Sequence, residues 1–256
     1  MEAMSLPEPN VLVAREGGVA TVTLNRPERR NGVTEQLCID LHRALADIAL
    51  GDARVVVLRG AGRDFCVGAD ISGLGGPRAD PRELRLAYHA STLLHTMPQV
   101  TIAAIDGGCA GAGLGWAMAC DLRYASDRAR FNTAFLAVGV PGDMGLVWSL
   151  NRLVGGARVR ELMLFPGKLE APRAEALGLV GRLFAADNLH GAVMQIAQGL
   201  AARDELALRL MKANFVSAET LALADYIEVE TARHIEASSR GDMAERLAAA
   251  LKEAKG

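Results

Sequence analysis

Residues 100–113 read VTIAAIDGGCAGAG, an apolar run that passes directly into a glycine-rich loop. The run Val100–Ile105 is short and almost continuously apolar, which predicts a strand buried on both faces. The apolar segment that follows, as far as Cys120, predicts a helix. Earlier in the chain, Arg54–Arg59 (RVVVLR) leads in the same way into a second glycine-rich loop, Gly60–Gly76. Strands that alternate with helices predict an α/β core.

The segments around this core first extend the pattern and then change it. Val11–Ala14 and Val19–Leu24 flank a glycine pair, which predicts a β-hairpin. From Asp143 onward the apolar spacing is almost entirely helical. We therefore expect a core domain over residues 1–195 and a helical C-terminal region over residues 196–256. The other predicted elements are helices at Thr34–Leu50, Pro81–Met97, Asp143–Val154, Ala157–Leu164, Ala171–Ala176, Leu189–Ala202, Glu205–Ser217 and Thr220–Glu253, and strands at Leu122–Ala125 and Ala129–Phe131.

The composition excludes several classes of protein. The 256 residues carry 28 Lys and Arg against 30 Asp and Glu, so there is no basic excess for binding nucleic acid. No apolar run reaches the roughly 20 residues that would span a bilayer, and the first ten residues, MEAMSLPEPN, lack the positive end of a secretory signal. The four cysteines lack CxxC spacing and the five histidines are scattered. We expect a cytoplasmic protein with reduced thiols, no metal site, and no membrane or nucleic-acid partner.

Both glycine-rich loops follow a buried strand, where a ligand can approach the backbone closely. A helix that begins near Ala112 would direct its free N–H groups and its positive dipole end at that ligand. Two such loops could aim two N–H groups at one oxygen, which is the geometry of an oxyanion hole. Loops of this composition also serve as plain turns or as nucleotide loops, and composition alone leaves these alternatives open. The loop after Val100–Ile105 lacks a convincing GxGxxG dinucleotide setting.

Several motifs, in order along the chain, resemble the crotonase family, also called the enoyl-CoA hydratase/isomerase family. The resemblance implies an α/β fold of the crotonase type: a right-handed spiral of ββα units with a helical C-terminal trimerisation region. It also implies a homotrimer or a dimer of trimers, and an acyl-CoA substrate, with coenzyme A as part of the substrate and no separate cofactor. The motifs are Leu24–Pro27 (LNRP), Phe65–Ile71 (FCVGADI), Ile102–Gly107 (IAAIDG), Ala119–Arg123 (ACDLR) and Gly155.

The resemblance assigns the oxyanion hole to the backbone N–H groups of Ala69 and Ala112. Family members usually have glycine at the second position, and alanine keeps the N–H while adding a methyl group. Charge that develops on the thioester oxygen would meet these fixed dipoles without any reorganisation. The alternative is that both alanines simply pack a loop against a strand.

The chain departs from the hydratases of the family at both catalytic glutamates. Gly115 and Phe135 take these positions, and neither side chain can transfer a proton. Asp143 lies nearby, where several branches of the family carry a catalytic aspartate. In dienoyl-CoA isomerases it moves a proton along the acyl chain, and in 4-chlorobenzoyl-CoA dehalogenases it is the nucleophile. Asp143 also precedes a predicted helix and would serve well as its N-cap, which is the structural alternative.

Further residues are expected around the substrate. As single residues, the charged ones could equally be solvated surface charges, and the aromatic ones ordinary core residues. The candidates are Arg29, Arg30, Asp70 and Ile71 at the adenine and phosphate end of CoA, Gly111 in the oxyanion loop, Tyr88 and Phe135 in the acyl pocket, and Lys212 at the CoA site.

These observations predict an enzyme that shifts a double bond in an enoyl-CoA through an oxyanion-stabilised enolate, with Asp143 as acid and base. An atypical enoyl-CoA hydratase, or an acyl-CoA hydrolase or lyase of the same fold, is the alternative among enzymes. A relative that binds CoA or RNA without chemistry is the alternative of another class, because both glutamates are missing.

Overall fold

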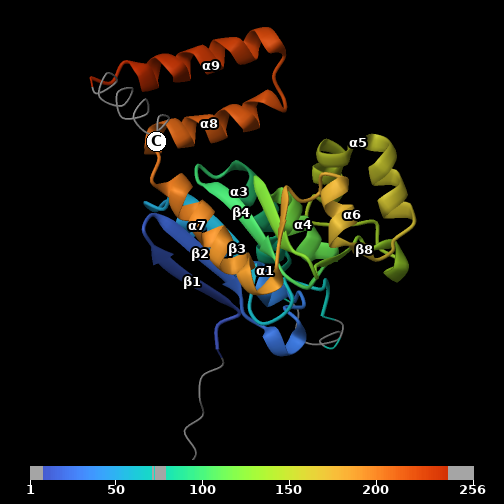
Figure 1. The fold of residues 1–256 in the computed structure, drawn as a ribbon. Coiled ribbons are helices and arrows are strands. Elements are labelled where there is room, and N and C mark those ends of the chain that lie inside the picture. Colours follow the sequence, from blue (N-terminus) through green and yellow to red (C-terminus); the bar gives the residue numbers. More distant parts are fainter. Residues whose placement is uncertain (1–7, 71, 73–78, 242–256) are drawn as a thin grey trace, which may run out of the picture. The chain divides into compact units, whose positions relative to one another are not determined.

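The computed structural model describes residues 8–70, 72 and 79–241. The chain divides into two compact units, residues 1–202 and 203–256, and each is described by itself. The boundary expected between residues 195 and 196 falls inside helix α7 (Leu189–Ala201). In the first unit, helices cover a twisted β-sheet, which is the α/β architecture predicted from the sequence (Figure 1).

The main sheet has six strands in the order β1-β2-β3-β4-β6-β9. β1 and β2 are antiparallel and meet at Gly17 and Gly18, both at positive φ, which confirms the predicted hairpin. All the other neighbours pair in parallel. Every residue of β4 is buried, as its apolar run predicts. The strands are β1 (Val11–Glu16), β2 (Val19–Leu24), β3 (Val55–Gly60), β4 (Val100–Ile105), β6 (Leu122–Ser126) and β9 (Arg182–Phe184).

A second sheet holds β5 (Gly108–Ala110), β7 (Arg130–Asn132) and β8 (Leu169–Glu170), in the order β5-β7-β8. β5 lies inside the stretch predicted to be a loop, so that prediction is wrong for these three residues. Glycine and alanine favour strands only weakly, so the sequence pattern carried no strand signal there. The parallel pairing of β5 with β7 imposes the extended conformation instead.

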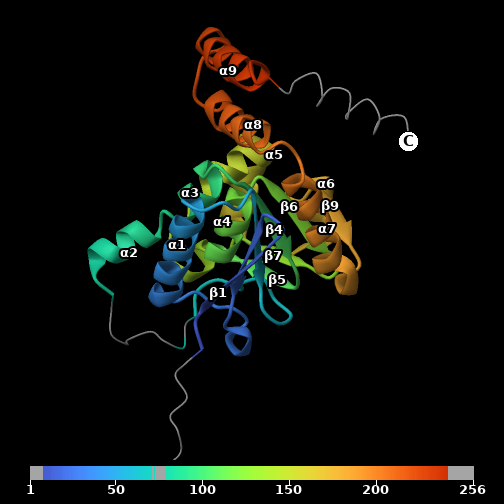
Figure 2. The same ribbon diagram turned by 90° about the vertical axis from the view of Figure 1, so that its left-hand side faces the viewer.

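The helices of the first unit lie on both faces of the main sheet (Figure 2). α1 (Glu35–Ala49) and α4 (Gly111–Ala119) lie on one face, and α7 lies on the other. α1 begins where predicted, because the Thr34 side chain accepts a hydrogen bond from the N–H of Leu37 at 3.1 Å. The first unit also contains α6 (Ala171–Ala176) and the 3-10 helices η1 (Pro27–Arg29), η3 (Leu136–Val138) and η4 (Ala186–Asn188).

Two helical segments are broken in the structure, and the sequence predicted only one of the two breaks. The single helix predicted at Pro81–Met97 is wrong, because the chain forms α2 (Pro81–Ala87) and α3 (Ala90–Thr96) with a break between them. α5 (Leu146–Leu164) is interrupted at Gly155, where φ is 77°, so the two separate helices predicted there are confirmed.

The second unit is a pair of helices, α8 (Glu205–Ala218) and α9 (Leu223–Ser238), joined by a short turn. Arg233 on α9 donates a hydrogen bond to Asn214 on α8 at 2.8 Å and so ties the pair together. The helix predicted at Thr220–Glu253 begins at Leu223, and its residues beyond 241 lie outside the described residues. Within the described ranges, the structure has no helix long and apolar enough to cross a membrane.

Candidate active site

The two glycine-rich loops lie side by side beyond the carboxyl ends of β3 and β4, which are neighbours in the main sheet. The N–H of Cys66 donates to the carbonyl of Gly108 at 3.0 Å, and the N–H of Ala110 donates to the carbonyl of Cys66 at 2.9 Å. A short parallel ladder therefore joins the loop after β3 to β5. Ala69 and Ala112, the two predicted oxyanion residues, follow three residues after Cys66 and two residues after Ala110, respectively.

The backbone N–H of Ala69 points away from its neighbouring segment. The N–H of Val33 donates to the carbonyl of Gly68 at 2.8 Å, and the N–H of Asp70 donates to the carbonyl of Val33 at 2.9 Å. These two bonds use the groups on either side of Ala69, so its own N–H faces the opposite side. Ala69 is exposed, and across the described residues its N–H has no acceptor.

The backbone N–H of Ala112 belongs to the first turn of α4, where a helix leaves its N–H groups without partners. No residue in the described part of the chain accepts a hydrogen bond from it. Gly68 and Gly111 lie against each other, because a Cβ atom on Gly111 would be in van der Waals contact with Cα of Gly68 at 3.5 Å, and both adopt positive φ, which glycine tolerates. Adjacent loops thus present one free N–H each, and the second has the positive end of the α4 dipole behind it.

Polar side chains hold the loop after β3 in place; this loop, which carries Ala69, is the first site loop, or first loop for short. Asn31 is fully buried at φ 55°, and its amide donates to two carbonyls of this loop, at 2.9 and 2.7 Å, and accepts from the N–H of Arg26 at 2.9 Å. The carboxylate of Asp64 accepts from the N–H of Gly108 at 2.6 Å and from Arg30 at 2.8 and 3.1 Å. Sequence reasoning missed Asn31 and Asp64, although an asparagine followed by glycine is a turn signal. Arg30, a predicted CoA residue, is thus paired within the protein.

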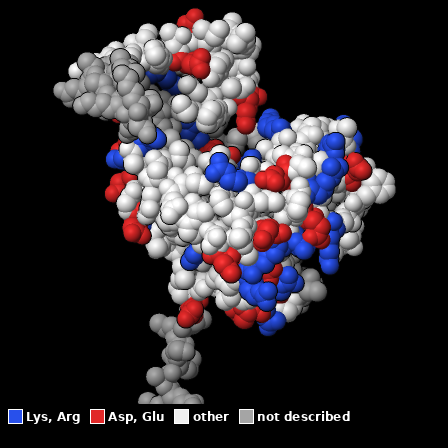
Figure 3. Space-filling view, in the orientation of Figure 1, with Lys and Arg blue, Asp and Glu red and all other residues white. Residues whose placement is uncertain are grey.

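The other residues expected at the adenine end of CoA differ in their surroundings. The carboxylate of Asp70 accepts hydrogen bonds from Ser72 and, at 2.8 Å, from Arg26, and these contacts lower the pKa of Asp70 to about 2. Arg29 is exposed at the end of η1. Figure 3 shows basic side chains gathered low on this face, where η1 lies in Figure 1. Ile71 lies outside the described residues.

Asp143 lies in the loop that leads into α5, and the alternative that it caps this helix is wrong. α5 begins at Leu146, its N-cap is Gly145, and no side chain forms a capping bond. The Oδ1 atom of Asp143 is fully buried, and it has no hydrogen-bond partner among the described residues. Burial raises the pKa of this carboxyl group to about 6. The residue before Asp143, a glycine, lies beside the Phe135 ring, which also lies beside Gly111 of the oxyanion loop.

The two positions that lack the family's glutamates, Gly115 and Phe135, both face the loop that carries Asp143 (residues 142–145). Phe135 is 6 % exposed, and its ring lies 3.9 Å from a methyl group placed on Gly111 and 3.9 Å from one placed on Gly142. A Cβ on Gly115 would lie only 2.6 Å from Cβ of Met144. Five of the predicted site residues therefore come together in the structure. They are Ala69, Gly111, Ala112, Phe135 and Asp143.

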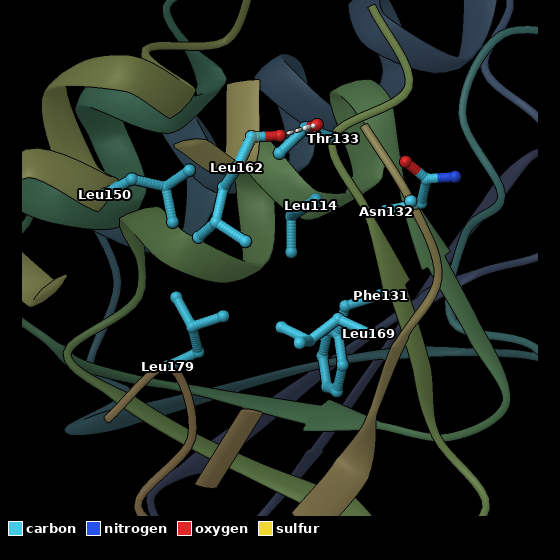
Figure 4. Close-up of a pocket in the computed structure, with 9 residues that line it drawn as sticks. Leu114, Phe131, Asn132, Thr133, Leu150, Leu162, Leu169 and Leu179 are labelled. Atoms are coloured by element: carbon cyan, nitrogen blue, oxygen red, sulfur yellow. Dashed lines mark hydrogen bonds between the residues drawn. The ribbon is translucent and has the colours of Figure 1, made fainter. Parts of the chain in front are cut away.

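A small apolar cavity of about 20 Å³ lies between α4, α5 and the second sheet (Figure 4). Leu114, Leu150 and Leu162 line it, and no ionisable side chain does, so it cannot move protons. Two further predicted residues, expected at the acyl pocket and the CoA site, have surroundings of their own. Tyr88 is 44 % exposed at the break between α2 and α3, and Lys212 lies on α8 in the second unit.

Comparison with known proteins shows which family the chain matches. Residues 14–253 match the family described as Enoyl-CoA hydratase/isomerase. A probable enoyl-CoA hydratase of Mycobacterium tuberculosis is 36 % identical over 251 residues, which cover 94 % of this chain and 96 % of that protein. A 1,2-epoxyphenylacetyl-CoA isomerase of Escherichia coli is 33 % identical, covering 84 % and 85 %. A 4-chlorobenzoyl coenzyme A dehalogenase of an Arthrobacter species is 32 % identical, covering 93 % and 89 %.

The fold has counterparts among solved structures. The crystal structure of a putative enoyl-CoA hydratase from Streptomyces coelicolor A3(2) matches with a TM-score of 0.88 at 32 % identity. The match covers 99 % of this chain and 95 % of that one.

Proposed function

The chain belongs to the enoyl-CoA hydratase/isomerase family and has the crotonase fold, and on this premise we propose that it shifts a double bond within an enoyl-CoA thioester. Family membership makes the substrate an acyl-CoA. The proposal adds that the reaction passes through an enolate, with Asp143 carrying the proton and the N–H groups of Ala69 and Ala112 binding the enolate oxygen.

The proposed steps need one carboxyl group and no external redox partner. In a 3-enoyl-CoA, the Asp143 carboxylate removes a proton from the saturated carbon C2, next to the thioester carbonyl. The electron pair of that C–H bond forms the C1=C2 bond of an enolate, and the carbonyl π electrons move onto oxygen. The two free N–H groups stabilise the resulting oxyanion. The carbonyl then re-forms, the electrons of the C1=C2 bond form the C2=C3 bond, and those of the C3=C4 bond take the proton from Asp143 at C4. The double bond has moved, and Asp143 is a carboxylate again.

The state of the Asp143 carboxyl group carries the proposal. A general base works best when its pKa lies near the working pH, and burial raises the pKa of Asp143 to about 6. Its buried Oδ1 has no partner within the described chain, as a group that awaits a substrate proton requires. Hydration calls for two proton-transfer groups around a water, and Gly115 and Phe135 supply none.

The binding of CoA and the assembly of the protein are also proposals. The exposed Arg29 and the basic side chains around η1 would bind phosphates, and Lys212 would contribute from α8. Tyr88 and Phe135 would line the acyl pocket. A homotrimer or a dimer of trimers would form through the C-terminal helices, as the family resemblance implies.

Deuterium incorporation tests the proposal. The protein would be incubated in heavy water with saturated, 2-enoyl, 3-enoyl and aryl-acetyl CoA thioesters, beside Asp143→Asn and a control, Asp52→Asn, which changes an exposed acid. We expect exchange and double-bond migration that vanish in Asp143→Asn and persist in Asp52→Asn. Hydration of a short 2-enoyl-CoA, or binding of every thioester without exchange, would overturn the proposal in favour of a hydratase or a silent binding protein.

A further inference from the structure

Gly115 on α4 faces Met144 in the Asp143 loop (residues 142–145), and there is no room for a Cβ atom between them. A Cβ atom on Gly115 would lie 2.6 Å from Cβ of Met144 and 3.3 Å from its carbonyl oxygen. Real Cβ atoms do not approach other atoms within 3.0 Å. No rotamer of Met144 relieves the contact, because both atoms are fixed to its main chain. A side chain at position 115 therefore has to move the backbone of Met144.

Met144 cannot move independently of its neighbours. It is 4 % exposed and adopts φ 49°, in the left-handed region, between Gly142 at φ 121° and Gly145 at φ 69°. The N–H of Leu146 donates to the carbonyl of Asp143 at 3.0 Å and closes a tight turn around it. A displacement of Met144 thus carries Asp143 with it.

Gly115 lies on the same side of α4 as Ala112, whose N–H belongs to the proposed oxyanion hole. It follows Ala112 by three residues, so the two lie on the same face of the helix. The other glycines of this helix serve different contacts, since Cβ atoms at Gly113 and Gly111 would meet Cys66 and Gly68 respectively. Gly115 is the one described glycine whose added Cβ would meet the Asp143 loop within 3.4 Å.

We infer that Gly115 is a positioning residue for the reaction: its missing side chain leaves room for the Met144 backbone, and that contact seats the Asp143 carboxyl group in the site. This inference rests on the proposed function of Asp143. It has a second consequence: any side chain at position 115, glutamate included, has to shift the present Asp143 loop, because its Cβ atom needs space that Met144 fills.

The test is a double-mutant cycle of Gly115→Ala, Met144→Gly and the double variant, with Gly199→Ala as the matched control. Gly199 lies in α7, and a Cβ there would meet nothing within 4 Å. Three quantities would be measured in each variant: the deuterium exchange rate, the affinity for a saturated acyl-CoA, and the pKa of the Asp143 carboxyl group. The pKa would come from the ¹³C chemical shift of the carboxyl carbon, followed against pH. Asp143→Asn would assign the NMR signal.

Gly115→Ala should lower the exchange rate at least tenfold, leave thioester affinity within about threefold, and bring the pKa of Asp143 down from about 6 towards its ordinary value. The double variant should recover both the rate and the pKa, because Met144→Gly removes the clashing Cβ and suits the positive φ. Gly199→Ala should change neither quantity.

Two results would overturn the inference. One is a Gly115→Ala protein that keeps both the rate and the pKa of Asp143. The other is a folded double variant, with a normal thermal midpoint, that recovers neither. The NMR titration reports how deeply the Asp143 carboxyl group is buried, through its pKa, and it needs no turnover. It therefore decides the inference even if no thioester exchanges deuterium and the proposed function fails.

Discussion

The carboxyl group of Asp143 lies within electrostatic range of the thiol of Cys38, a fully buried residue on α1. Burial, and then the charge of Asp143, raise the pKa of Cys38 to about 12. The Asp143 side chain is half-buried, and its Oδ1 atom is fully buried without a hydrogen-bond partner among the described residues. This burial is the origin of the raised pKa of Asp143.

All four cysteines should be unreactive in the native protein. They are buried, and burial raises the pKa of Cys66 to about 12 and that of Cys109 well above its ordinary value, so thiolate is scarce at pH 8. Titration with a thiol reagent should modify none of them in native buffer and four in denaturant. Rapid labelling of the native protein would show that the interior beside Asp143 opens to solvent.

The fall of kcat/KM at low pH should follow the protonation of Asp143. A base must be ionised to accept a proton, and the pKa of Asp143 is about 6, so kcat/KM should be level above pH 7 and fall towards about one tenth of its plateau at pH 5. The profile would be measured from deuterium exchange into the best thioester. A limb near pH 4 would mean that the base is an ordinary exposed carboxylate.

Asp143→Asn should stabilise the protein in neutral solution. The folded-state pKa, about 6, lies above the ordinary value of 3.8, so the folded state disfavours the charged form. The cost is complete above pH 6 and disappears below pH 3.8, where the group is protonated in both states. Removing the charge should gain about 1 kcal/mol at pH 8, a value reduced for the partial exposure of Asp143.

This gain should appear as a rise of about 2–4 °C in the thermal midpoint at pH 8. Little of it should survive at pH 4. Equal midpoints for the wild type and Asp143→Asn at pH 8 would contradict the buried environment of the carboxyl group.

Asn31→Ala should destabilise the first site loop. The change leaves two loop carbonyls and the N–H of Arg26 without their partner and puts alanine at φ 55°, so we expect a loss of about 2–4 kcal/mol. Asn31→Gly should cost less, because glycine tolerates this φ. The exposed Asn151 on α5 is the control, and Asn151→Ala should change the denaturation midpoint little. A small effect of Asn31→Ala would show that water replaces the amide.

Sequence periodicity was enough for the elements whose burial repeats regularly. The apolar runs of β3 and β4, the hairpin of β1 and β2, and α1 with its Thr34 cap all appear as predicted. In these segments local preference and tertiary packing favour the same conformation. The resemblance to a known family then supplied the fold and the acyl-CoA substrate.

The failures occur where tertiary contacts decide the conformation. β5 is extended because β7 pairs with it, and its own residues give no such signal. The site shows the same limit. The residues Gly115 and Asp143 could be named from motif positions, but their connection through Met144 depends on a distance that no local pattern encodes.

The absence of a side chain at Gly115 also limits how this chain could acquire a second acid. A glutamate there would bring its Cβ atom within 2.6 Å of Cβ of Met144, so the loop at residues 142–145 would have to shift to make room. That loop carries Asp143, and a gain of the second carboxyl group would therefore come with a displacement of the first.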